Sequence, residues 1–335
     1  MGDIIFRAKK ITETAKDVTW IAHEGDTQLS AKGFMRKNGD QGEQLLRGTP
    51  PAREPQETKE EKCFCEKVFT EEDIQSFYNI NNLFSAKNCP LPGDEKNYKT
   101  LTEWLNKTME QYDINTCLRK AHFLAQAEAE TGFLTTVEYA DGWDYDHTTH
   151  LDFYNKYQLF LKDKKKYAEY GTNAIRRGYN RYKECLAHGH NVKGYGPKYK
   201  GRGLIQLTWK DSYEEYFNYL KNPKLTDTPE VVANSLQYAC DSAGWNWKIG
   251  SAWGDLNEYA DNDDFISVCI GVNGGLNGFA HRKRNLKKIL LLMKVARLCQ
   301  KVKDKSIGSY KYETSKIRNT KYGKNHKSEI QKFDD

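Results

Sequence analysis

The stretch AHFLAQAEAETG (121–132) decides how this 335-residue chain is interpreted. Its small and apolar residues recur at helical spacing, and Gly132 is placed to end the helix. Glu128 and Glu130 lie near the C-terminal end of this helix, two positions apart, so they face different sides of it. Glu130 shares a face with Phe123, which predicts that Glu130 is the more buried of the two acids.

A further carboxyl group, that of Glu138, lies beyond the end of this helix. Hydrolysis of a glycosidic bond needs two carboxyl groups around that bond, one protonated and the other ionised to activate water. A helix end and the segment after it can supply such a pair. With 46 Asp and Glu residues in the chain, two ordinary surface glutamates remain the alternative explanation.

The segment YKGRGLIQLT (199–208) is more specific. Two glycines flank Arg202, and an apolar stretch with Gln206 and Thr208 follows. Glycines let the backbone approach a ligand closely, and an amide and a hydroxyl two residues apart can hold a water molecule or a sugar substituent. A third segment, VNGGLNG (272–278), predicts a turn-rich loop that presents the amide of Asn273, or else an ordinary helix connection.

These three segments, in this order, resemble glycoside hydrolase family 19, the family of plant-type chitinases and of many phage and bacterial endolysins. The resemblance extends over residues 66–299 and includes Trp245, Trp247 and Arg282. It implies a mainly α, lysozyme-like glycosidase domain with two lobes around a cleft. Such a domain cleaves a β-1,4 bond next to N-acetylglucosamine or N-acetylmuramic acid with inversion.

The resemblance also implies roles for individual residues. Glu130 matches the general acid, Glu138 falls near the general base, and Thr208 matches the residue that helps to position the attacking water. The matches to sugar-contacting positions are Tyr199, Gln206, Asn273 and Arg202. An inverting pair of carboxyl groups lies roughly 6.5–9.5 Å apart. Neither a metal nor an organic cofactor is expected.

The chain departs from the family pattern in three places. Ala129 precedes the acid, where the family usually has His or a similar polar residue. The spacing from the acid to the second carboxyl is one residue shorter than in the plant enzymes, so Asp141 or Asp144 could replace Glu138 as the base. Residues 146–198 match no family motif, and we expect them to form one wall of the cleft and to set specificity.

The chain is expected to contain four segments. Residues 1–47 alternate like strands and predict a small β module, and residues 48–65, rich in Pro and charge, predict a linker. The glycosidase domain covers 66–299, and a basic tail covers 300–335. From Thr70 on the pattern is mainly helical, with helices expected at about 70–80, 97–112, 115–131, 152–169, 205–220, 229–247, 261–270 and 280–301.

Charge and hydropathy narrow the function classes. Residues 301–335 carry ten Lys or Arg and five Asp or Glu, which is +5 of the formal +6 of the chain. The nearly neutral remainder argues against a nucleic-acid-binding domain, and the tail is expected to be solvated and frayed, or to contact a polyanion. No apolar run approaches the ~20 residues of a bilayer span, so no membrane insertion is expected.

The eight cysteines are too scattered along the sequence for a zinc site. Cys63 and Cys65 form the one close pair, and they lack the two-residue spacer of a metal knuckle. Most of the cysteines are expected to be small buried hydrophobic residues, and disulfides stay open as an alternative.

Chitin and peptidoglycan share the N-acetylglucosamine unit, so the catalytic residues do not separate them. The N-terminus lacks the apolar core of a secretory signal, and residues 3–40 loosely resemble the repetitive strands of type VI secretion spikes and phage tails. This context favours a peptidoglycan hydrolase, an antibacterial effector or endolysin, which is made in the cytoplasm and acts outside the cell or in a target periplasm. A spike or tail carrier and an immunity protein would then be its partners. The alternatives are a chitinase and a non-catalytic glycan-binding module.

Overall fold

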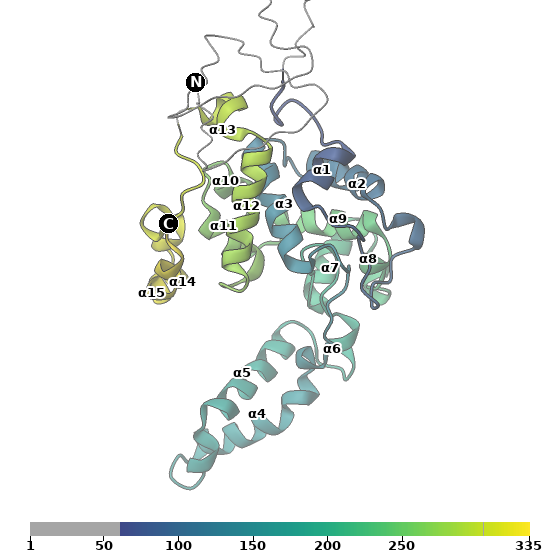
Figure 1. Cartoon of the computed structure of the whole chain (residues 1–335). Coiled ribbons are helices and arrows are strands. Elements are labelled where there is room, and N and C mark those ends of the chain that lie inside the picture. The colour runs from purple at the N-terminus through teal and green to yellow at the C-terminus, as the bar shows by residue number, and fades with distance from the viewer. Residues whose placement is uncertain (1–60, 304) are drawn as a thin grey trace, which may run out of the picture. The chain divides into compact units, whose positions relative to one another are not determined.

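The computed structural model describes residues 61–303 and 305–335. The chain divides into two units, Met1–Thr58 and Lys59–Asp335, and the described residues belong to the second. They are mainly α-helical (Figure 1), which confirms the mainly α part of the predicted fold class. The β module expected at 1–47 lies outside the described residues, as does most of the linker expected at 48–65. None of the described helices is both long and apolar enough to cross a membrane.

The helix α3 is the centre of the core. It begins after Thr116, whose side chain accepts a hydrogen bond from the backbone N–H of Arg119, and it ends where Gly132 adopts φ +61°. It packs against α10, α11 and α12, while α2 packs against α1 and α9. The bounds of these helices are α1 Glu71–Tyr78, α2 Tyr98–Gln111, α3 Cys117–Thr131, α9 Leu236–Trp245, α10 Asn257–Ala260, α11 Phe265–Asn273 and α12 Phe279–Leu292.

Shorter helices complete the body. They are α6 Tyr195–Lys198, α7 Lys210–Tyr219, α8 Val231–Asn234, α13 Val295–Leu298, α14 Lys321–Asn325 and α15 Lys327–Ile330. The helix expected at 205–220 begins only at Lys210, because residues 205–209 form bridges and a turn instead. Cys63 and Phe64, which the sequence analysis places in the linker, are buried in the core.

The helices α4 (His147–Lys162) and α5 (Asn173–Ala187) pack side by side as a hairpin that projects from the body (Figure 1). Their contact relies on aromatic rings, since Tyr154 stacks on Tyr179 and Tyr182 with centroids 5.4 and 4.3 Å apart. The sequence analysis did not predict α5, although Ile175, Tyr179 and Tyr182 recur at helical spacing within its mostly polar sequence.

The C-terminal residues 305–335 fold onto the body, so the expectation of a solvated, frayed tail is wrong. Their apolar side chains Tyr310, Tyr312, Ile317 and Ile330 are buried in the core. The side chain of the last residue, Asp335, accepts hydrogen bonds from Lys283 (3.1 Å) and Lys287 (2.9 Å) of α12. The net basic charge of this segment therefore lies on the outer face of an ordered structure.

Candidate active site

Glu130 lies in the last turn of α3 and forms an ion pair with Arg282 of α12. Arg282 Nη2 donates to Glu130 Oε1 at 2.5 Å, and Nη1 donates to Gln126 Oε1 at 2.8 Å. The side chains of Glu130 and Glu128 are almost equally exposed, at 13% and 15%. The sequence analysis expected Glu130 to be clearly the more buried of the two, and burial does not distinguish them in this way. Their partners do: Glu128 accepts hydrogen bonds from His281 and Asn285, whereas Glu130 faces a buried guanidinium.

Arg282 also connects Glu130 to the loop expected at 272–278. Its Nε donates to the carbonyl of Asn277 at 3.3 Å. Asn273, at the C-terminal end of α11, has a buried Oδ1 with no hydrogen-bond partner among the described residues. The same holds for Gln126 Nε2, beside Glu130. Buried polar atoms without partners are rare in folded proteins, so these two are candidate contacts for a ligand.

Glu138 lies beside the second predicted segment, and backbone pairing places it there. Its N–H donates to the carbonyl of Gly201 at 3.0 Å, while Val137 pairs with Arg202 and Arg202 pairs with Leu207 in antiparallel bridges. Three extended stretches thus lie side by side. This pairing brings Glu138 next to the segment that carries Gln206 and Thr208.

Three side-chain oxygens converge over Gly201. A Cβ atom at this position would lie 2.8 Å from Gln206 Oε1, 3.2 Å from Glu138 Oε2 and 3.3 Å from Thr208 Oγ1. Any other residue at 201 would fill the space between these oxygens, so glycine keeps it open. A carboxylate and a hydroxyl at such distances can hold a water molecule, with the carboxylate accepting one of its protons.

Burial raises the pKa of Glu138, and a hydrogen bond from the Tyr145 hydroxyl to Oε2 (3.1 Å) opposes this in part. Its Oε1 is buried and bonds no other described residue. A carboxylate with a raised pKa is a stronger base once it is ionised. Glu138 therefore has the chemical character of a base that acts on water.

The loop that carries Thr208 is strained and held by packing. Gln206 and Trp209 have φ of +56° and +78°, a region that bulky residues rarely adopt and that requires on the order of 1–3 kcal/mol. The Thr208 hydroxyl donates to the carbonyl of Gln206 at 2.8 Å. The Trp209 ring packs edge-on against Tyr145, with centroids 5.1 Å apart. Packing of this ring stabilises the conformation that points Thr208 at Glu138.

The structure places Tyr199 and Arg202 in the wall behind these oxygens. Tyr199 is buried and packs against Tyr213, with ring centroids 5.8 Å apart. The Arg202 guanidinium is also buried and donates to the carbonyls of Lys198 (2.8 Å) and Lys200 (3.1 Å). Both side chains therefore bond or pack against protein groups, and their expected contacts with sugar stay predictions.

The two alternative bases lie elsewhere. Asp141 accepts a hydrogen bond from the backbone N–H of Trp143 at 3.1 Å. Asp144 pairs with Arg181 at 2.8 Å and its side chain is 71% exposed. Glu138 is the one of these three carboxyl groups that the structure brings to Thr208.

The sequence analysis did not assign roles to Tyr145, Arg282, Gln126 and Trp209 in this site. For Arg282 a signal was present, because it lies on the same face of α12 as the buried Phe279, Leu286 and Ile289. A cation on an apolar face indicates a buried anionic partner. Tyr145 and Trp209 carry no such signal, since their positions follow from long-range packing.

Comparisons with known proteins find relatives of this chain. The chain is similar to a glycosyl hydrolase family 19 domain-containing protein of Haemophilus influenzae, with 29% identity over 177 residues that cover 52% of this chain and 80% of that protein. It is 44% identical to an endochitinase of Arabidopsis thaliana over 54 residues, which are 16% of this chain and 19% of that protein. No family model matches the sequence.

Among solved structures, chitinase C from Streptomyces griseus HUT6037 aligns with a TM-score of 0.44 and 16% identity, over 67% of this chain and 76% of that one. A bacterial family 19 chitinase aligns with a TM-score of 0.45 and 18% identity, over 68% of this chain and 95% of that one.

Proposed function

Because the chain carries a glycoside hydrolase family 19 domain, we propose that it hydrolyses β-1,4 glycosidic bonds of peptidoglycan by an inverting acid/base mechanism. The observation that carries this proposal is the convergence of Glu138, Gln206 and Thr208 over Gly201, together with the Arg282-bound Glu130 at the end of α3.

The proposed mechanism has one step. Glu130, which must first bind a proton beside Arg282, gives this proton to the glycosidic oxygen as the bond to the anomeric carbon breaks. A water molecule held by Thr208 and Glu138 attacks the anomeric carbon from the opposite face and loses a proton to Glu138. The new hydroxyl lies on the face opposite to the broken bond, so the configuration inverts, and later proton exchange with water restores both carboxyl groups.

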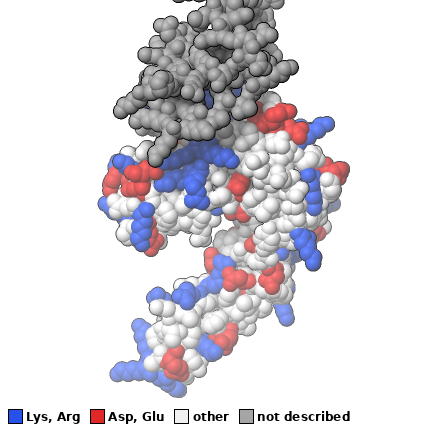
Figure 2. Space-filling model, viewed as in Figure 1, with Lys and Arg blue, Asp and Glu red and all other residues white. Residues whose placement is uncertain are grey.

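The charge of the hairpin region favours peptidoglycan over chitin. Residues 146–198 carry eleven Lys or Arg and five Asp or Glu, a net +6. Figure 2 shows basic side chains gathered at the free end of the hairpin, where Lys164, Lys165 and Lys166 are exposed. Peptidoglycan bears peptides with carboxylates, whereas chitin is neutral, so a basic hairpin would attract peptidoglycan and not chitin.

The test is digestion of purified sacculi and of chitin oligomers, with products identified by mass spectrometry. Wild type should release muropeptides with new reducing ends, and Glu130→Gln should release none. Glu128→Gln is the matched control, since Glu128 lies two residues away and contacts His281 instead of Arg282. Release of muropeptides by Glu130→Gln at the wild-type rate would contradict the proposal.

Chitin is the second candidate substrate, because the 54-residue match is to a protein described as an endochitinase. Products from chitin oligomers with none from sacculi would establish this alternative. Turnover of neither polymer, with retained sugar binding, would indicate a glycan-binding module.

We also propose, from the sequence resemblance of residues 3–40, that residues 1–47 dock on a secretion-spike or phage-tail carrier that delivers the hydrolase to a competitor. A cognate immunity protein would then protect the producing cell. A chain without residues 1–47 should keep its activity on sacculi and lose delivery to target cells; unchanged delivery would refute the docking role.

A further inference from the structure

Four cysteine side chains meet at the end of α3 that is opposite to Glu130. The sulfur atoms of Cys63, Cys65, Cys117 and Cys299 all lie within 4.8 Å of one another. Cys65 Sγ is 3.5 Å from Cys117 Sγ and 3.6 Å from Cys299 Sγ. The expectation that the cysteines are too scattered for a zinc site is therefore wrong, because the fold brings together residues as far apart as Cys65 and Cys299, 234 positions along the chain.

The spacing of the sulfur atoms fits a tetrahedral metal site. Zinc–sulfur bonds of about 2.3 Å in a regular tetrahedron place neighbouring sulfur atoms about 3.8 Å apart. A disulfide needs a sulfur–sulfur distance of about 2.05 Å and joins two cysteines only. Here Cys65 lies almost equally close to Cys117 and Cys299, which is the arrangement of ligands around one shared centre.

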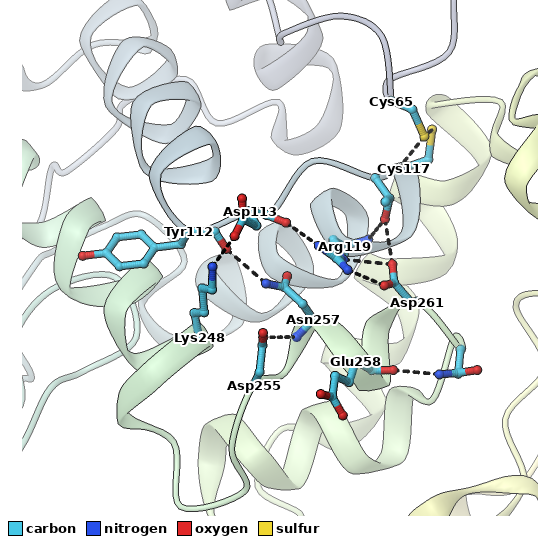
Figure 3. A network of polar contacts seen from close by, with 12 residues as sticks. Cys65, Tyr112, Asp113, Cys117, Arg119, Lys248, Asp255, Asn257, Glu258 and Asp261 are labelled. Carbon is cyan, nitrogen blue, oxygen red and sulfur yellow. Dashed lines mark hydrogen bonds and ion pairs between the residues drawn. The ribbon is translucent and has the colours of Figure 1, made fainter.

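Positively polarised and positively charged groups surround the four sulfur atoms. Cys117 is the first residue of the 15-residue α3, where the helix dipole stabilises an anion, and its backbone N–H donates to Cys65 Sγ at 3.3 Å (Figure 3). The buried Lys120, one turn further along α3, donates to the carbonyls of Phe64 (2.7 Å) and Lys67 (2.9 Å). This lysine fixes the turn that carries Cys63 and Cys65, and its charge would offset part of the negative charge of a tetrathiolate.

A polar network around Asp261 also holds the N-terminal end of α3, where the cysteines meet. Asp261 accepts a hydrogen bond from the Thr116 hydroxyl (3.1 Å). It also accepts one from Arg119 Nε (2.9 Å), which Figure 3 shows. These bonds fix the first turn of α3, to which Cys117 belongs. Cys63, Cys117 and Cys299 are buried and Cys65 is half-buried, so an ion could enter on the side of Cys65.

We propose that Cys63, Cys65, Cys117 and Cys299 bind one structural Zn²⁺ ion as a closed tetrathiolate site. Four protein ligands leave no position open for substrate, and α3 separates the site from Glu130 by 13 residues, about 20 Å along the helix. The ion ties the turn at 63–65 and the segment after α13 to the first turn of α3.

The test is the metal content of the full chain, purified without chelators from cells grown with zinc. Elemental analysis should find about one zinc per chain, and Zn-edge X-ray absorption should find sulfur ligands at about 2.3 Å. Cys117→Ser should lose the zinc. The matched control, Cys185→Ser, changes a cysteine buried in the hairpin and should keep it.

A second measurement on the wild-type chain remains decisive if Cys117→Ser does not fold. Replacement of zinc by Co²⁺ should give the visible absorption of a tetrahedral cobalt thiolate, and chelation should lower the melting temperature. A chain with no bound metal and eight titratable thiols would overturn the proposal. A denatured mass four units low, which is the signature of two disulfides, would also overturn it.

Discussion

The two ends of α3 differ in how their chemistry is assembled. At the C-terminal end, Glu130 and Gln126 come from the helix itself and need one distant partner, Arg282. At the N-terminal end, Cys117 is joined by three cysteines from segments far away in the sequence. The difference teaches that a site carried by one local motif can be recognised from the sequence, whereas a site assembled from distant residues needs the fold.

The largest effect is expected at the C-terminal end. Glu130→Gln should lower turnover of sacculi by about 10⁴-fold, because the amide keeps the volume of the carboxyl group and cannot donate a proton to the leaving oxygen. Its zinc content should equal that of wild type, since the metal is bound at the other end of α3. Turnover and metal content measured on the same preparation check both statements.

A substrate with a dinitrophenyl leaving group separates the two carboxyl groups. This leaving group needs no proton, so Glu130→Gln should regain most of its activity on it, and Glu138→Gln should stay inactive. Recovery of Glu138→Gln instead would mean that the two roles are reversed.

The second effect concerns the ion pair that fixes Glu130. Arg282→Met should destabilise the protein by about 3–5 kcal/mol, because it leaves the Glu130 carboxylate largely buried without its partner. The double variant Arg282→Met/Glu130→Gln should regain part of this loss, since no charge is then left unpaired. Urea unfolding of wild type, Arg282→Met, Glu130→Gln and the double variant measures the coupling. A double variant no more stable than Arg282→Met would show that Glu130 does not depend on Arg282.

The third effect is smaller. Thr208→Ala should lower kcat by about 10²-fold, the loss expected when a group that positions a reactant is removed. Thr208→Ser keeps the hydroxyl that lies over Gly201 and should restore most of the activity. Steady-state kinetics of the two variants measure these changes in kcat. A loss for Thr208→Ala as large as that for Glu130→Gln would assign Thr208 a role beyond holding water.

Much of the α3 side of the fold could be predicted because its signals are local. The caps at Thr70 and Thr116, and Gly132 as the end of α3, all follow from residues within one turn. The helix α5 was missed, because the residues of its inner face are few and partly tyrosines that stack against α4, within a mostly polar sequence. The order of residues 305–335 was missed for a related reason: their few apolar side chains are widely spaced and pack only against the finished body.

The site shows the same division. Glu130 and Thr208 lie in motifs and Glu138 lies shortly after one, and the structure brings Glu138 and Thr208 together over Gly201. Tyr145, which donates to Glu138, and the convergence of the four cysteines depend on contacts between distant segments, and no local pattern encodes these.

The smallest expected effect concerns the burial of Glu138. Burial raises the pKa of this carboxyl group in the folded state, so the native protein binds the proton more tightly than the unfolded chain does. Between the unfolded-state and folded-state pKa values the free energy of unfolding therefore falls as pH rises. Glu138→Gln removes this dependence, so the variant should be slightly more stable than wild type near neutral pH, and the difference should vanish in acid.

Urea unfolding of wild type and Glu138→Gln across the acidic to neutral range measures this difference, with Glu128→Gln as the control at a carboxyl group that is bonded to His281 and Asn285. The same raised pKa also affects hydrolysis, because Glu138 must be ionised to accept a proton. As the pH is lowered, hydrolysis should be lost at a higher pH than with a base of ordinary carboxyl pKa. If Glu138→Gln were less stable than wild type at neutral pH, the hydrogen bond from Tyr145 would outweigh the unfavourable burial of the charge. The pKa of Glu138 would then not be raised by burial, and its suitability as a base would rest on its position alone.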